Sequence, residues 1–180
     1  IWHKEAVRRG LPNLRTTPEA LPVLVTPEVV EVYEKAGVLN KAELRARQDI
    51  YVEQYCKTVR TEANLVISMA RTIIVPAAMR YQGEVAGTAV SMRSLGLEAK
   101  TITLEEVTEQ LRQIQAATAA LESARADVDA KGIGIEAARR YCSEVLPHMA
   151  TVRSHADMLE TRVADDLWAL PNYQEILFGK

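Results

Sequence analysis

The stretch TLEEVTEQLRQIQAATAALESARADV, residues 103–128, decides the fold class. Thr103 and Glu106 have the spacing of a capping box at its start, and a lysine and two glycines at 131–134 mark its end. Its apolar residues recur every three or four positions, so they lie on one face of a helix, which can pack against other helices. These residues are Leu104, Val107, Leu111, Ile114, Ala117, Leu121, Ala124 and Val128. The sequence therefore predicts a helix over residues 103–131.

A second long helix is predicted upstream, over residues 41–95. Asn40 and Glu43 resemble a capping box at its start, with Asn in place of the usual Ser or Thr. Pro76 lies inside it and is expected to kink it, because proline removes a backbone hydrogen bond and clashes with the preceding turn. Before this proline, the residues predicted to form the buried stripe of the helix are Val52, Tyr55, Val59, Ala63, Val66, Met69 and Ile73.

A third long helix is predicted downstream, from Ile135 to Leu170, because apolar residues again recur every three or four positions. Pro147 is expected to kink this helix and Pro171 to end it. The tail after Pro171, residues 172–180, is expected to dock on the helices through Tyr173, Ile176, Leu177 and Phe178.

Residues 1–39 are predicted to form a linker or arm with one short helix over about 27–36. Four prolines lie in the first 27 residues, and the residue before a proline avoids the helical region, so we expect an extended chain there apart from a turn near Lys4–Arg9. The arm is locally basic, and we interpret this charge as a solvated surface.

The predicted fold is an all-α antiparallel bundle of about three long helices, two of them kinked, with an irregular N-terminal arm, and its bundle domain spans residues 40–180. Helix 41–95 is about twice as long as helix 103–131, so the second can cover only part of the first. The segment 50–59 is expected to project and to need cover from the arm, the tail or another chain. Its candidate partner-facing residues are Ile50, Tyr51, Val52, Tyr55 and Val59.

The composition is that of an ordinary soluble protein. Of 180 residues 48% are hydrophobic and the formal net charge is −2, which argues against disorder and against a basic nucleic-acid binder. We expect no membrane span and no secretory signal, and the missing initial Met suggests a fragment or a processed chain. Two cysteines, Cys56 and Cys142, make no disulfide framework, so we interpret them as reduced thiols of a cytoplasmic protein.

Familiar catalytic and nucleotide-binding motifs are absent from the sequence. Glu144, His148 and His155 could share one helical face and bind a metal, but no acidic cluster elsewhere completes the set, and we favour a solvated or partner-facing stripe. Asp165 and Asp166 are adjacent, and adjacent helical side chains diverge, so they do not form an acid–base pair. We therefore predict no catalytic, cofactor-binding or metal-binding residue in this chain.

Four segments, in the same order and at the same spacing, resemble the C-terminal region of type III glutamine synthetases. They are WHKEA (2–6) through RGLPNL (9–14) and TTPEALP (16–22), then Tyr51-x-x-x-Tyr55 leading into I-x-PAA-x-RYQ (74–82), then EVLP-x-M (144–149), and DDLW-x-LP-x-Y-x-x-x-LF (165–178). The resemblance extends along almost the whole chain.

This resemblance implies a parent enzyme that condenses glutamate with ammonia using ATP and Mg²⁺ or Mn²⁺, and that assembles as two stacked hexameric rings. The family's catalytic residues lie upstream of Trp2, so this chain alone is expected to be inactive. Its expected role is assembly, in contact with the catalytic domain and neighbouring subunits. Two alternatives remain open at this point, namely a regulatory module that binds a protein or small effector, and a stand-alone helical scaffold or interaction module.

Overall fold

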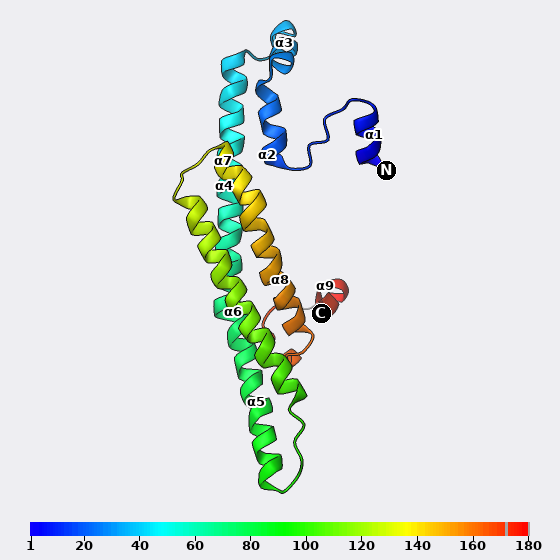
Figure 1. Cartoon of the computed structure of the whole chain (residues 1–180), viewed down its shortest axis with the longest axis vertical. Helices are drawn as coiled ribbons and strands as arrows, with labels where there is room; N and C mark the ends of the chain where they lie inside the picture. Colours follow the sequence, from blue (N-terminus) through cyan, green and yellow to red (C-terminus); the bar gives the residue numbers. More distant parts are fainter. Residues whose placement is uncertain (172, 180) are drawn as a thin grey trace. The chain divides into compact units, whose positions relative to one another are not determined.

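The computed structural model describes residues 1–171 and 173–179, and every regular element in these ranges is helical, which confirms the all-α prediction (Figure 1). The chain contacts form two compact units. Unit 1 comprises Ile1–Thr61 and Asp127–Glu144, and unit 2 comprises Glu62–Ala126 and the chain from Val145 onward. The expected domain boundary after residue 39 stays a prediction.

The helical elements follow one another along the chain with short connections. In order they are α1 (Trp2–Arg8), α2 (Thr17–Ala20), the 3₁₀ turn η1 (Leu21–Val25), α3 (Pro27–Lys35), α4 (Lys41–Met69), the π-helical turn η2 (Ala70–Ile74), α5 (Val75–Ser94), α6 (Ile102–Asp129), α7 (Ile135–Arg140), the π-helical turn η3 (Tyr141–Val145), α8 (Leu146–Glu160), the 3₁₀ turn η4 (Asp165–Leu167) and α9 (Tyr173–Phe178).

Pro76 and Pro147 each lie two residues after the end of a π-helical turn. Pro76 lies in the first turn of α5 and Pro147 in the first turn of α8. A proline cannot donate to the carbonyl four residues back, and its ring would clash with that carbonyl. The N–H of Val75 bonds to the carbonyl of Ala70, five residues back, so the helix is wider where Pro76 needs room. The distortion expected at both prolines therefore takes the form of π-helical turns.

The N-terminal arm in unit 1 is more helical than expected. α1 covers the predicted turn near Lys4–Arg9, and α3 agrees with the predicted helix over 27–36. Residues 17–25 were expected to be extended, but they form α2 and η1. The reason is that Pro18 and Pro22 stand in the first turns of these segments, where proline's fixed φ is favourable and its missing N–H has no helical partner.

The core of unit 1 lies where the N-terminal part of α4 meets α7 and the end of α6. The predicted capping box of α4 is confirmed, since Asn40 N–H donates to Glu43 Oε2 at 2.7 Å and Glu43 N–H donates to Asn40 Oδ1 at 3.0 Å. α2 packs against α7. The main buried side chains of this unit are Pro18, Leu44, Val52, Cys56, Val59, Val128, Ala138 and Tyr141.

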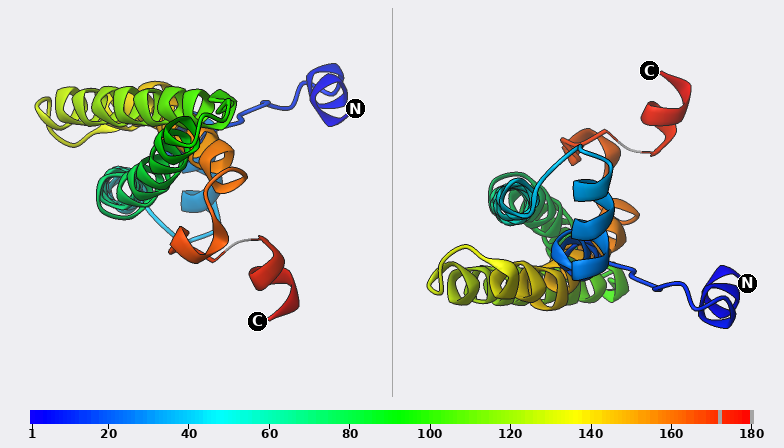
Figure 2. Two further views of the ribbon diagram at one scale, coloured as in Figure 1. Left: turned by 90° about the horizontal axis from the view of Figure 1, so that it is seen from below. Right: turned by 90° about the horizontal axis from the view of Figure 1, so that it is seen from above.

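In unit 2, residues 95–101 join α5 and α6 into an antiparallel hairpin, and α8 lies alongside α6 (Figures 1 and 2). Gln82 Nε2 donates to Thr108 Oγ1 at 2.7 Å between α5 and α6, and His155 Nδ1 lies 3.2 Å from Gln110 Oε1 between α8 and α6. Most of the predicted α6 seam is buried and so confirmed. The larger buried side chains of this unit include Ile67, Ile74, Val107, Leu111, Ile114, Leu121, Val152 and Leu159.

Two predictions about the long helices were wrong in detail. After Ala63 the buried positions are Ile67 at the end of α4 and Ala70 at the start of η2, one residue beyond the predicted Val66 and Met69, which are half-buried. Helix α6 begins at Ile102, and Thr101 donates to Glu105 at 2.7 Å, so the cap lies two residues before the predicted Thr103. The spacing of apolar residues predicts the buried face of a helix only to within about one residue, because a step of three and a step of four both stay on the same face.

The last long helix is shorter than predicted. α8 ends at Glu160, ten residues before Leu170. The carbonyl of Met158 accepts bonds from the Thr161 hydroxyl at 2.9 Å and from Arg162 Nη1 at 3.1 Å, so polar side chains close the helix end. Val163 is nevertheless buried, so the apolar seam continues after the helix has ended.

The tail after Pro171 contains α9, but most of its apolar side chains are exposed. Ile176, Leu177 and Phe178 are 68%, 72% and 73% exposed. Only Ile176 contributes to the surface of a groove, described below. Residue 172 and the side chain of Tyr173 lie outside the described part of the chain, and the docking of the tail stays a prediction.

One helical stretch, Lys41–Ser94, includes an 18-residue window with a mean hydropathy of 1.2, and a third of that window is buried. By length and composition alone this stretch could cross a membrane, but core helices of soluble proteins have the same properties. The expectation that the chain has no membrane partner therefore stays a prediction.

Candidate functional site

The candidate partner surface divides into an outer and an inner part. Ile50 and Tyr51 are 59% and 43% exposed, and Tyr55 is half-buried. Val52 and Val59, in contrast, lie in the core of unit 1 at 5% and 4% exposure. The segment is helical, so residues seven apart share the inner face while their neighbours point outward. Only Ile50, Tyr51 and part of Tyr55 remain available for a partner.

Of the three side chains considered for a metal site, Glu144 and His155 have other partners, and His148 is half-buried in α8. Arg140 Nε and Nη2 each lie 2.7 Å from a carboxylate oxygen of Glu144, and His155 contacts Gln110. Asp165 and Asp166 are exposed in η4 rather than on a helix face. Across residues 1–171 and 173–179 no three His, Cys, Asp or Glu side chains come together as a metal-binding group.

A polar cluster in unit 1 joins the buried Tyr141 to the half-buried Asp129 and the exposed Arg60. Tyr141 is 3% exposed, and its hydroxyl donates to Asp129 Oδ1, while Arg60 Nε lies 3.4 Å from the other oxygen of Asp129. Burial, together with the bond to Asp129, raises the pKa of Tyr141. The phenol therefore stays protonated at neutral pH, and the cluster ties α4, α6 and η3 together without providing a reactive group.

The two cysteines are free thiols, as predicted. Cys56 is buried, its Sγ lies 3.9 Å from the carbonyl of Gly134, and burial raises the pKa of its thiol. A thiol held in its protonated form is a poor nucleophile. Cys142 is half-buried.

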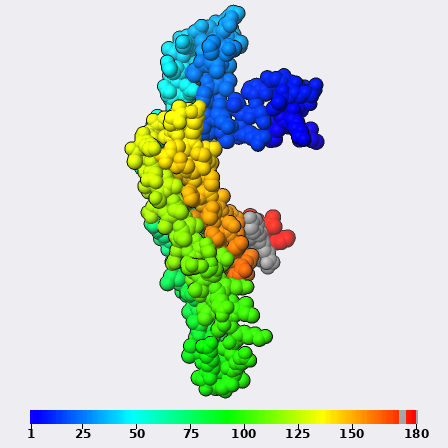
Figure 3. Space-filling model, in the orientation of Figure 1, coloured from blue at the N-terminus to red at the C-terminus, as the bar shows by residue number. Residues whose placement is uncertain are grey.

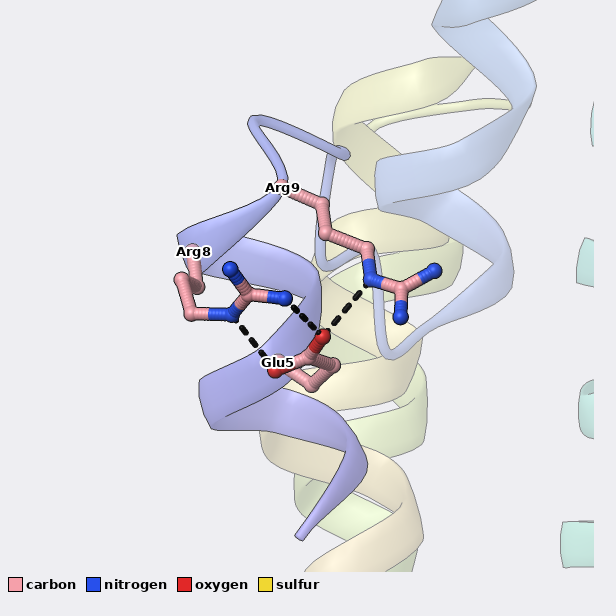
Figure 4. A network of polar contacts seen from close by, with 3 residues as sticks. All are labelled: Glu5, Arg8 and Arg9. Carbon is pink, nitrogen blue, oxygen red and sulfur yellow. Dashed lines mark hydrogen bonds and ion pairs between the residues drawn. The ribbon is translucent and has the colours of Figure 1, made fainter.

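The N-terminal arm combines a network of one carboxylate and two arginines with an apolar surface. Glu5 accepts hydrogen bonds from Arg8 Nε at 2.8 Å and from Arg9 Nε at 2.7 Å, and these bonds lower the pKa of Glu5 (Figure 4). His3 Nδ1 lies 2.8 Å from Asn13 Oδ1, so this contact connects α1 to the segment that follows it. The apolar side chains that remain more than 40% exposed around this network are Ile1, Trp2, Val7, Leu11 and Leu14.

An apolar groove of about 500 Å³ lies in unit 2, beside α8 and the segment that follows it. Figure 3 shows this unit with α8 in orange and α9 in red. Three charged side chains, Arg153, Asp157 and Glu160, stand on one edge of the groove. Its apolar lining consists of Val66, Met69, Ile74, Val152, Ala156, Trp168, Leu170, Pro171 and Ile176.

Sequence reasoning missed the groove, although its lining includes predicted seam positions of two helices, namely Val66, Met69, Val152, Ala156 and Leu170. In a continuous helix to Leu170, the last three of these would lie along one face. Because α8 ends at Glu160, Trp168, Leu170 and Pro171 instead form a second wall of the groove, in addition to Val152 and Ala156. The only local signal for this is the polar pair Thr161 and Arg162, which closes the helix.

Comparison with known proteins identifies the family. A family model described as the glutamine synthetase C-terminal domain matches residues 1–93, which is 93 of 180 residues and just over half of the chain. The chain belongs to the glutamine synthetase C-terminal domain family. This finding confirms the resemblance expected from the four sequence segments.

Curated relatives of this glutamine synthetase C-terminal domain align with nearly all of it. It is 29% identical to a glutamine synthetase of Bacteroides fragilis (strain YCH46), over 99% of this chain and 26% of the relative. It is 30% identical to the type-3 glutamine synthetase of Dictyostelium discoideum, over 98% of this chain and 25% of the relative. A glutamine synthetase of Butyrivibrio fibrisolvens is 28% identical, with coverage of 99% and 26%. The chain thus spans about a quarter of the length of these relatives.

Proposed function

We propose that this chain is the C-terminal, non-catalytic domain of a type III glutamine synthetase, an enzyme that joins glutamate and ammonia at the expense of ATP. One observation supports this proposal above all others. Each relative aligns with nearly the whole chain, while the chain accounts for only about a quarter of the relative. The remaining three quarters are long enough to contain a separate catalytic region.

The side chains present fit a non-catalytic role. Phosphoryl transfer from ATP needs clustered carboxylates to hold divalent metals and cations to neutralise phosphate oxygens. In the part of the chain that the structure describes, carboxylates pair with arginines on helix surfaces, as Glu144 does with Arg140. We assign the ATP and Mg²⁺ or Mn²⁺ of the parent enzyme to the region that precedes this chain.

The proposed role of the domain is assembly with that preceding region and with neighbouring subunits, in a cytoplasmic double-ring oligomer. The exposed apolar side chains of the arm, such as Trp2 and Leu11, support this proposal, because apolar surface gains free energy when a partner covers it. The near-neutral net charge supports a protein partner over a nucleic acid.

The test is the mass of this chain in solution, alone and with the preceding region supplied in trans. We expect a complex of the two and no glutamine formation by this chain alone. A chain that never binds the preceding region would refute the assembly role. A reading frame that begins with Met just before Ile1 would instead support a stand-alone helical scaffold.

A further inference from the structure

We propose that the apolar groove of unit 2 seats an apolar segment of the preceding region of the same enzyme, with a basic residue of that segment beside Glu160. This inference rests on the proposed function, because it takes the occupant from the three quarters of the relatives' length that this chain does not cover. It adds which surface of the domain binds and which chemistry binds to it.

The walls of the groove are parts of well-packed elements. Val152 and Ala156 of α8 are 2% and 8% exposed, and Ile74 of η2 is 6% exposed, so the floor is continuous with the core of unit 2. η2 packs directly against α8, and α5 packs against η4 just before the second wall. A preformed apolar concavity of this size is typical of sites that take several buried side chains of a ligand or peptide.

The domain's own tail does not supply the occupant. Ile176 of α9 already forms part of the lining, and residue 172 alone separates the wall residue Pro171 from the start of α9. Leu177 and Phe178 remain 72% and 73% exposed. The tail therefore acts as a further wall, and it adds exposed apolar surface beside the groove rather than filling it.

The charges on the edge of the groove specify a basic occupant. Arg153 Nε lies 2.5 Å from Asp157 Oδ1, so these two charges compensate each other. Glu160 is half-buried on the same edge and has no ion pair among the described residues. A half-buried carboxylate of this kind favours a Lys or Arg on the partner, through electrostatic complementarity.

Trp168 also lines the groove, and its indole Nε1 is buried and has no hydrogen-bond acceptor in the part of the chain that the structure describes. Because this nitrogen is itself buried, it presents no accessible donor to an occupant. The groove thus combines apolar surface with the half-buried carboxylate of Glu160, which fits a segment that carries a basic residue better than a purely apolar small molecule.

The experiment uses photo-crosslinking in the full-length enzyme. A benzoylphenylalanine is incorporated at position 176, which lines the groove, and in a matched control at position 177, which has similar exposure but does not line it. A third probe, at position 2 in the arm, reports the proposed function independently. Crosslinked peptides are identified by mass spectrometry.

We expect the probe at position 176 to crosslink to peptides that precede Ile1, with a yield about fivefold above that at position 177. Glu160→Lys is expected to lower this yield about fivefold through charge repulsion, whereas Asp166→Lys on exposed η4 is expected to leave it unchanged. Thermal unfolding of each variant checks that the domain stays folded.

Equal yields at positions 176 and 177, or crosslinks from position 176 only to residues 1–180 of the same or a second copy, would overturn the groove assignment. If the probe at position 2 still reaches the preceding region in that case, the proposed function stands and only the inference fails. If no probe reaches it, both fail.

Discussion

Leu121 has no exposed surface and lies in the seam of α6, in unit 2. Replacing it with Ala removes three carbon atoms from the core, at about 0.8 kcal/mol each, or about 2.4 kcal/mol in total. A residual cavity of about 50 Å³ adds about 1 kcal/mol at about 24 cal/mol per Å³. We therefore expect Leu121→Ala to lower the free energy of unfolding by about 3–4 kcal/mol, and Leu159→Ala in α8, which is also fully buried, to have a similar effect.

The assay is urea unfolding followed by far-UV circular dichroism, with Leu65→Ala as the matched control. Leu65 also lies on a helix of unit 2, but it is 58% exposed, so its replacement is expected to change the free energy of unfolding by less than about 0.5 kcal/mol. A loss below about 0.5 kcal/mol for Leu121→Ala, or an equal loss for Leu65→Ala, would refute the reasoning that the α6 seam forms the core.

Three further predictions concern polar contacts. Because the pKa of Tyr141 is raised, the unfolded chain releases this proton first, near pH ~10, so the free energy of unfolding is expected to fall as pH rises above about 10. Urea titrations at several pH values should show a smaller fall for Tyr141→Phe, and an equal fall would contradict the buried bond to Asp129. Asn40→Ala removes one half of the α4 capping box and should lower the free energy of unfolding by about 1 kcal/mol in the same assay, and no loss would contradict that cap. Glu122→Gln breaks an exposed ion pair with Arg71, so a small loss in the free energy of unfolding that shrinks with added salt is expected, and a loss independent of salt would argue against a charge effect.

Local chemistry was sufficient to predict much of the fold. The α6 seam is the longest regular pattern in the chain, and its central residues from Val107 to Leu121 are buried as expected. The reciprocal hydrogen bonds of Asn40 and Glu43 could be predicted from the sequence, because the start of a helix leaves backbone N–H groups that nearby side chains satisfy. Prolines marked the two disturbed turns for a similarly local reason. The family, too, could be identified from four segments of sequence.

Other features depend on contacts between distant residues, and sequence patterns do not fix them. Pro18 and Pro22 fit either an extended arm or short helical turns, and the observed turns include one that packs on α7. The predicted partner surface also included both the exposed Ile50 and the buried Val52. The periodicity of apolar residues does not show which face of a helix is covered by neighbouring helices.

The sequence by itself determined the helical class of this chain, the start of α4, the positions of its disturbed turns and its family. Only the tertiary structure decided where the last long helix ends and what its remaining apolar residues do. A seam from Ile135 to Leu170 fits one straight helix as well as a helix followed by a returning segment, because both bury the same side chains. Side-chain bonds to the carbonyl of Met158 and packing of the returning segment select the second arrangement, and that choice creates the apolar groove.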